Sequence, residues 1–204
     1  LTGSRVKWND QLFGSQIILS ELNGTTGRIA AETPIGLKLN GKATDVGQSW
    51  SVHIALDALL TADRDIRYLT LLPMELHLTE LTTEQGLIGQ AVLTSTIEAD
   101  LTANRYLANG MAGRFTAGGA ALWNATIQAD LLTNLTLDLR AQTLQLSGLS
   151  ASSGSLQLNG SLTAQRLFDA PIVSGRLAIT ELNLRAWLNQ AGLPTPSTTD
   201  PTAL

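Results

Sequence analysis

The sequence predicts a mainly β protein: a long, curled antiparallel meander that forms an open groove or a flattened barrel or sandwich, with one short helix near the C-terminus. Three observations lead to this fold class. Apolar side chains recur at every second position in many short runs, turn signals containing Gly separate the runs, and connections with the period of a helix are missing between them. We therefore expect about ten to thirteen strands of roughly five to eight residues each, joined by hairpins.

The alternating runs define the expected strands in order along the chain. In each run the apolar residues would share one face of a strand, and the polar residues between them, such as Lys38, Glu75 and Gln145, would share the other. The in-phase residues are Ile35, Leu37 and Leu39; Val52, Ile54 and Leu56; Met74, Leu76 and Leu78; Ala91, Leu93, Ser95 and Ile97; Leu135, Leu137 and Leu139; Leu144 and Leu146; Leu156 and Leu158; and Leu177 and Ile179.

Dipeptides that favour turns separate these runs. Each contains Gly, which adopts the left-handed backbone conformation of tight turns at little cost. A charged segment over residues 63–72 is also expected to be an exposed loop or turn. The predicted dipeptide turns are Asn23-Gly24, Asn40-Gly41, Gln85-Gly86, Asn109-Gly110, Gly118-Gly119, Ser153-Gly154 and Asn159-Gly160.

One helix is predicted near the end of the chain, over about residues 183–191. Asn183 can accept hydrogen bonds from its first turn, Gly192 stands at the expected stop, and Pro194 follows. Residues 195–204 have the composition of a linker, so we expect a single β-groove domain over 1–194 and a linker-like tail over 195–204. The apolar stripe of the helix consists of Leu184, Trp187, Leu188 and Ala191.

The composition excludes several classes of protein. Charged residues are only 15% of the 204 residues, against about a quarter in typical domains. The net charge is −4, so a nucleic-acid footprint has no electrostatic support. Cysteine is absent, which excludes a disulfide scaffold, a thiolate metal site and a cysteine nucleophile. Both ends look cut, and we expect an interior segment of a longer protein.

No sequence motif indicates an enzyme. Gly-x-Ser-x-Gly, a phosphate-binding glycine loop and His-Glu-x-x-His are all missing from the sequence. His53 and His77 occupy polar positions of their runs and could form a metal pair only if the two strands align. We therefore expect no catalytic residue, no cofactor and no metal. The isolated tryptophans are expected to anchor the core or an edge: Trp8, Trp50, Trp123 and Trp187.

A sheet with one apolar face must cover that face with a second sheet, with helices or with a ligand. One short helix is too small to cover about twelve strands spaced by about 4.8 Å, so the sheet either folds onto itself or curls into an apolar trough. A trough would suit acyl chains, because each methylene removed from water gains about 0.8 kcal/mol. The candidate groove residues are Leu135, Leu137, Leu139, Leu144, Leu146, Leu156, Leu158, Leu177 and Ile179.

The last part of the chain resembles the AsmA family. The most specific similarity lies in residues 167–177 (LFDAPIVSGRL), 182–188 (LNLRAWL), 191–194 (AGLP) and 199–204 (TDPTAL). Residues 26–29 and 50–56 show a less specific similarity. Trp187 stands where we would expect Leu, which keeps the apolar stripe. The resemblance implies a large envelope protein of Gram-negative bacteria, anchored in the inner membrane and linked to outer-membrane assembly. It also implies kinship with bridge-like lipid-transfer proteins, whose repeated β-groove units form a slide for phospholipid.

The sequence and the resemblance together predict a non-enzymatic periplasmic segment that binds or conducts phospholipid acyl chains along an apolar β-groove. The parent protein would be anchored in the inner membrane by a segment absent from this chain. The alternative is a structural or protein-docking β-sandwich module of the cell envelope without lipid binding. Expected partners are phospholipid or another acyl lipid, flanking repeats of the same chain and envelope proteins, but not nucleic acid. We also expect self-association through open sheet edges.

Overall fold

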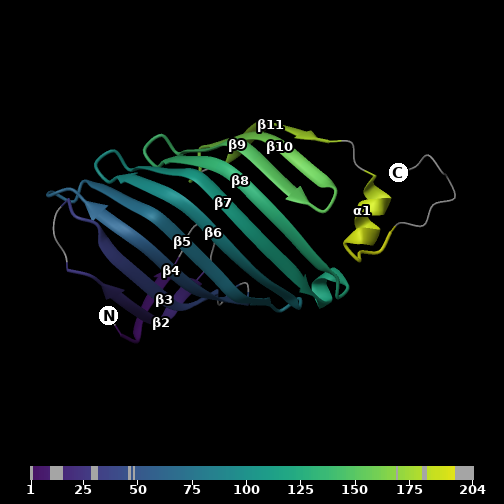
Figure 1. Cartoon of the computed structure of the whole chain (residues 1–204), viewed down its shortest axis with the longest axis horizontal. Helices are drawn as coiled ribbons and strands as arrows, with labels where there is room; N and C mark the ends of the chain where they lie inside the picture. Colours follow the sequence, from purple (N-terminus) through teal and green to yellow (C-terminus); the bar gives the residue numbers. More distant parts are fainter. Residues whose placement is uncertain are drawn as a thin grey trace.

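A computed structural model of the protein describes residues 2–9, 16–28, 32–45, 47, 49–168, 170–180 and 183–195. Within these residues eleven strands form one antiparallel sheet, in which each strand pairs with its neighbours in sequence (Figure 1). The predicted mainly β meander is confirmed, and the sheet stays open instead of closing into a barrel. The strands are β1 (Ser4–Asn9), β2 (Gln16–Thr26), β3 (Ile35–Asp45), β4 (Trp50–Ala62), β5 (Tyr68–Thr83), β6 (Leu87–Asp100), β7 (Arg105–Gly119), β8 (Thr126–Asp138), β9 (Thr143–Ser153), β10 (Leu156–Gln165) and β11 (Ile172–Ile179).

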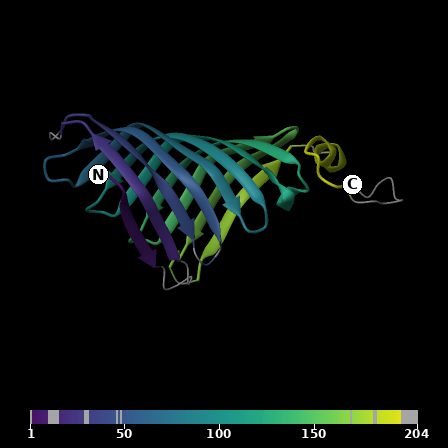
Figure 2. The same cartoon turned by 90° about the horizontal axis from the view of Figure 1, so that it is seen from below.

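The sheet is strongly curved. Figure 2 shows the middle strands across the top and the first and last strands descending from it on two sides, so the sheet forms a trough. The predicted helix is α1 (Leu184–Gln190), and a single 3-10 turn, η1 (Ala120–Leu122), follows β7. Both lie beyond the ends of the strands and not over the sheet (Figure 1). The expected tail from 196 onward lies outside the described residues.

The strands are longer than predicted, and in β5, β7 and β9 a β-bulge joins two alternating runs into one strand. β2 to β11 have between 8 and 16 residues. In β5, the longest, the pairing with β6 shifts between Leu71 and Met74 and again between Leu78 and Leu81. Pro73 lies within the first shift, which is where a central strand tolerates a residue without a backbone N–H. The charged segment after β4 is an exposed turn only as far as residue 67, where β5 follows.

Several predicted turns are positions inside strands. Gln85-Gly86 and Ser153-Gly154 do lie at hairpin turns, but the four Asn-Gly dipeptides lie within β2, β3, β7 and β10. Gly is required there for other reasons. Gly110 has a φ of +57° at a bulge of β7, and a Cβ on Gly41 would lie 2.8 Å from the Leu22 side chain. The backbone freedom and small size that suit Gly to turns suit it equally to bulges and close approaches.

The register shifts line up across the sheet, because β5, β7 and β9 each carry a bulge that is met from both sides by regular neighbouring strands. A bulge bends its strand and increases the local twist, so a row of bulges curves the whole sheet along one line. This row explains how a single sheet forms a trough. The register shifts that form the row lie between Ala58 and Leu60, Leu71 and Met74, Thr94 and Thr96, Ala108 and Met111, Leu132 and Asn134, and Gly160 and Leu162.

Two buried hydroxyl groups bind backbone carbonyls in this bulge row. Thr133 Oγ1 lies 3.3 Å from the carbonyl oxygen of Asn134 and 3.2 Å from that of Ser147. Ser95 Oγ makes the equivalent contacts one hairpin earlier, both at 3.2 Å. Thr133 is 1% exposed, and no other side chain in the described part of the chain is less than 2% exposed. The hydroxyls therefore satisfy carbonyl groups that the bulges displace from the regular ladder.

The hairpins β6–β7 and β8–β9 are two copies of one structural unit. Their special residues correspond at a constant offset in sequence. Asp100 and Asp138 each end a strand and accept hydrogen bonds from backbone N–H groups of the following turn. The remaining equivalent pairs are Ser95 and Thr133, Asn104 and Gln142 with φ of 56° and 52°, and Gly110 and Gly148 with φ of 57° and 60°.

The bulge hydroxyls predict a specific loss of stability. Thr133→Val keeps the shape of the side chain but leaves the carbonyl groups without their donor, so the free energy of unfolding should fall by about 1 to 2 kcal/mol. Thr94→Val, on the exposed polar face of β6, should change it by no more than about 0.5 kcal/mol. Chemical denaturation of both variants measures the difference, and equal effects would contradict a structural role for the Thr133 hydroxyl.

Candidate functional site

The apolar residues of neighbouring strands stay in register across the sheet. Directly opposed residues form continuous rows that run from strand to strand, and none of their members is charged. The first row consists of Leu39, Leu56, Leu76, Leu93, Gly113, Leu131, Ala151, Leu158 and Ile179. The second consists of Ile35, Leu60, Leu71, Ile97, Ala108, Leu135, Leu146, Leu162 and Gly175. The third consists of Ala62, Leu69, Ala99, Tyr106, Leu137, Leu144, Ala164 and Val173.

The face that carries these rows, which we call the apolar face, is the more sheltered face of the sheet. In β8, Leu131 and Leu135 are half-buried, whereas Gln128, Asp130 and Asn134 on the opposite face are exposed. No second sheet or helix lies over the apolar face in the described residues, so its shelter comes from curvature. The apolar face is therefore the concave face of the trough.

The apolar face is not a filled core. Its long leucine side chains stay partly exposed, and the fully buried apolar residues are mostly small or lie at the bulges. A packed interior would bury large side chains completely against one another. The leucines instead line a surface that remains open to solvent. The buried apolar residues are Ile35, Ala43, Val52, Ala58, Met74, Ala91, Ala108, Ala125 and Leu149.

Charges lie mainly on the opposite, convex face. Lys38 Nζ is 2.7 Å from Asp57 Oδ2, and Arg114 Nε is 2.8 Å from Asp130 Oδ1, in both cases between neighbouring strands. The hydrogen bond from Lys38 to Asp57 and the negative charge of that carboxylate raise the pKa of Lys38. Asp45 is an exception on the apolar face, where it ends β3, is buried and accepts a hydrogen bond of 2.9 Å from the Gly47 N–H.

The structure places eight of the nine candidate groove residues on strands, and all eight belong to the apolar face. Leu139 lies in the turn after β8, where its N–H donates to the carbonyl oxygen of Asn104 at 3.0 Å. Sequence analysis missed that the N-terminal half of the sheet contributes equally to the face, although its alternation was visible. The eight are Leu135, Leu137, Leu144, Leu146, Leu156, Leu158, Leu177 and Ile179.

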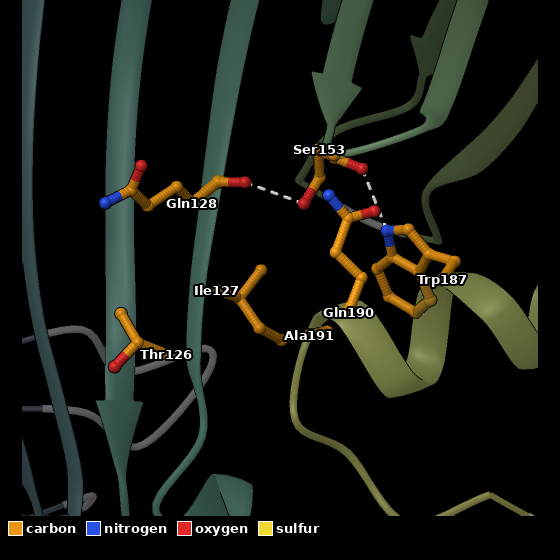
Figure 3. A pocket seen from close by; sticks show the side chains of 8 residues that line it. Thr126, Ile127, Gln128, Ser153, Trp187, Gln190 and Ala191 are labelled. Atoms are coloured by element: carbon orange, nitrogen blue, oxygen red, sulfur yellow. Dashed lines mark hydrogen bonds between the residues drawn. The ribbon is translucent and has the colours of Figure 1, made fainter.

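Helix α1 closes a small polar cavity at the rim of the sheet. Asn183 Oδ1 accepts the Ala186 N–H at 2.9 Å, as the sequence predicts for the cap, and Gly192 follows the helix with a φ of +71°. Trp187 Nε1 donates to the carbonyl oxygen of Ser153 at 2.8 Å (Figure 3). The cavity holds about 210 Å³. Its size and its polar lining do not suit an acyl chain, so α1 acts as a structural element of the rim.

The tryptophans do not all behave as anchors. Trp187 is half-buried and attaches α1 to the sheet, and Trp50 is half-buried at the start of β4. Trp123 is 67% exposed in the turn before β8, so the prediction that it anchors the core or an edge is wrong. Its φ of 51° places the residue in a left-handed turn that directs the ring into solvent. The side chain of Trp8 lies outside what the structure describes.

The two histidines lie on neighbouring strands but each has a carboxylate partner of its own. His77 Nε2 lies 2.8 Å from Glu75 Oε1, and His53 Nε2 lies 3.4 Å from Glu80 Oε2. Sequence analysis missed the first pair, although residues two apart on a strand share a face. In the described residues, no group of three or more His, Cys, Asp or Glu side chains is arranged to hold a metal ion.

The comparisons with known proteins add no relative. No protein-family model matches the chain, and no curated protein or solved structure matches it either. Among the described residues, no helix is long and apolar enough to span a membrane.

The attachment of α1 can be tested at Trp187. Trp187→Phe keeps an aromatic side chain but removes the indole N–H that donates to Ser153, so the amides of α1 should exchange about two- to tenfold faster with deuterium. The midpoint of global unfolding should hardly change, because the helix lies outside the sheet. Trp123→Phe is the matched control at an exposed indole. Hydrogen exchange read by mass spectrometry checks this, and unchanged exchange in α1 would show that the Trp187 hydrogen bond does not hold the helix.

Proposed function

We propose that this chain is a non-enzymatic lipid-binding segment whose apolar face holds the acyl chains of phospholipid or of another acyl lipid. The observation that carries the proposal is an uncharged apolar face that stays in register over nine strands and has no covering layer within the described residues. Such a face exposes apolar surface to water unless something covers it. A flexible apolar ligand fits the smooth leucine lining.

The size of the face suits acyl chains. From β3 to β11 there are eight inter-strand steps, which at about 4.8 Å each amount to roughly 38 Å along the curved sheet. One leaflet of a bilayer has an apolar thickness of about 15 Å, half of the hydrocarbon core. About two acyl chains of this length could therefore lie end to end along the face. Each methylene that leaves water would gain up to about 0.8 kcal/mol.

The absence of charge in the three rows decides where a headgroup would lie. Burying a phosphate without a partner in an apolar trough costs far more than the acyl chain gains from a few methylenes. The headgroup would therefore stay in water at the mouth of the trough, and the acyl chains alone would contact the leucines. Such a surface recognises chains and not headgroups, so it would accept lipids with different headgroups.

We extend the proposal to the cellular location of the protein and to its role there. The resemblance of residues 167–204 to the AsmA family favours a periplasmic location, a parent protein anchored in the inner membrane and a part in outer-membrane assembly. An open apolar trough is the shape expected of a unit that carries lipid across an aqueous space. In this proposal the chain would contribute one stretch of a longer lipid path.

Native mass spectrometry tests the proposal on the intact chain. The protein is incubated with vesicles of phosphatidylethanolamine and phosphatidylglycerol, separated from them and sprayed from a volatile buffer. We expect a population that carries one or more phospholipid masses above the 21.6 kDa chain. A lipid-free mass both before and after incubation would overturn lipid binding and favour a structural or protein-docking role.

A pair of variants in one strand locates the site. Leu137→Glu places a charge in the third apolar row, whereas Leu132→Glu places it on the convex face, where the leucine is already 52% exposed. We expect the amount of bound phospholipid to fall at least about tenfold in the first variant. The second variant should bind as much phospholipid as the unmutated chain.

Circular dichroism shows whether each variant keeps its strand content. If Leu137→Glu does not fold, Leu135→Gln in the second row replaces it, because a neutral polar side chain disturbs a half-buried position less. Equal lipid binding by apolar-face and convex-face variants that both fold would contradict the proposed site.

A further inference from the structure

The edge of the sheet at β11 is apolar, and no described strand pairs with it on its outer side. All eight residues of β11 are exposed, and its pairing with β10 is regular, without a bulge. Four of the eight are large apolar residues: Ile172, Val173, Leu177 and Ile179. A long, flat and apolar edge is a template for adding another strand.

The edge at β1 differs from the edge at β11. Proteins protect edge strands by making them short, by bulges and by charged side chains, especially Lys. β1 has six residues, carries Arg5 and Lys7, and pairs with β2 across a bulge of β2, which shifts the register between Ser4 and Val6. β11 has none of these features except one charge, Arg176 on the convex face. The protection of one edge only suggests that the other is normally covered.

The backbone groups that face the open edge can be identified. The Thr180 N–H donates to the carbonyl oxygen of Gln157 at 3.1 Å, so the even-numbered residues are those that bond to β10. Because hydrogen-bonding direction alternates along an antiparallel strand, the N–H and C=O groups of Val173, Gly175 and Leu177 point away from the sheet. These residues also belong to the apolar face.

We propose that β11 pairs antiparallel with β11 of a second copy of this chain, about a two-fold axis perpendicular to the sheet. Such an axis reverses the strand direction but leaves both apolar faces on the same side. Pairing through the outward-pointing odd residues then places apolar residues opposite apolar residues. The two troughs would join into one continuous apolar surface.

Charge selects the register of this pairing. A dyad at Arg176 would place two arginines directly opposite each other, which is destabilising. A dyad at Gly175 places Val173 opposite Leu177 on the apolar face and Ser174 opposite Arg176 on the convex face. This register separates the two charges and keeps nearly the whole strand paired.

Charge also argues against head-to-tail growth through β1. If a second copy extended the sheet in the same orientation, β1 would lie parallel to β11, because odd-numbered strands of the meander run the same way. Parallel pairing is slightly less stable, and it would place Arg5 and Lys7 near Arg176 on the convex face. The symmetric pair avoids this repulsion. The inference uses only the edge geometry and stands whether or not the trough binds lipid.

Mass in solution is the first test, made on lipid-free protein. Light scattering after size-exclusion chromatography should give twice the 21.6 kDa chain mass for the unmutated chain. Val173→Lys should give the monomer, because it places a charge at the paired apolar edge. Ile66→Lys, a matched change at a residue 63% exposed in the turn before β5, should remain a dimer.

Disulfide trapping tests the register, and the chain has no cysteine of its own. Opposed residues that are not hydrogen-bonded to each other lie about 4.5 Å apart at Cα, within the range of a disulfide. The dyad at Gly175 also places Ile172 opposite Ala178, and changing these two residues leaves Arg176 in place. A mixture of Ile172→Cys and Ala178→Cys chains should therefore cross-link under mild oxidation, whereas each variant alone should cross-link at least about tenfold less.

Three results would overturn the proposal. If the unmutated chain is monomeric at micromolar concentration, it has no such interface. A dimer that survives Val173→Lys is held together elsewhere. Open-ended polymers indicate head-to-tail pairing of β1 with β11. Since none of these measurements involves lipid, their failure and the failure of lipid binding are distinguishable.

Discussion

The whole structure depends on keeping one phase of every strand on one side of the sheet. Side chains alternate along a strand, so a slip of one residue between two neighbours would move a complete set of leucines to the convex face. The bulges respect this constraint. In β5 the apolar face takes odd-numbered residues up to Leu71 and even-numbered residues from Met74 to Leu78, and the row through Leu71 still continues to Leu60 and Ile97. Curvature is thus introduced without breaking the apolar rows.

Openness follows from the same arrangement. A sheet that curls along a line of bulges shelters its concave side without bringing a second layer against it, so large side chains there end up half-buried. The closest packing is found where the backbone bends, at Thr133 and at small residues such as Ala58, Ala91 and Ala108. Stability therefore comes mainly from ladder hydrogen bonds and contacts between neighbouring strands, and the apolar face is left available for another role.

Local signals predicted local features well. The cap at Asn183 and the stop at Gly192 depend only on nearby residues, and they located α1 within a residue or two. Features that depend on the pairing of two strands could not be predicted from the sequence. Ser95 stands in an alternating run, but the carbonyl of Asn109 that it binds is known only once β6 and β7 are paired. Asn109-Gly110 was misplaced in a turn for a related reason, since the positive φ of Gly110 suits a hairpin turn and a bulge alike. Eight of the nine candidate groove residues share one face because alternation is local, whereas the extent of that face across the N-terminal strands became clear only from the register.

The correspondence between β6–β7 and β8–β9 has a consequence for how such a protein changes size. Each hairpin contacts only the hairpins on either side, and the same hydroxyl, aspartate and glycine positions recur in both units. Architectures of this kind behave as one-dimensional arrays, in which stability is a sum over units and their junctions. Gain or loss of a whole hairpin by duplication or deletion would alter the reach of the sheet by about 10 Å, two strand spacings, while leaving its curvature unchanged. Length is then a quantity that evolution can adjust in discrete steps without redesigning the fold.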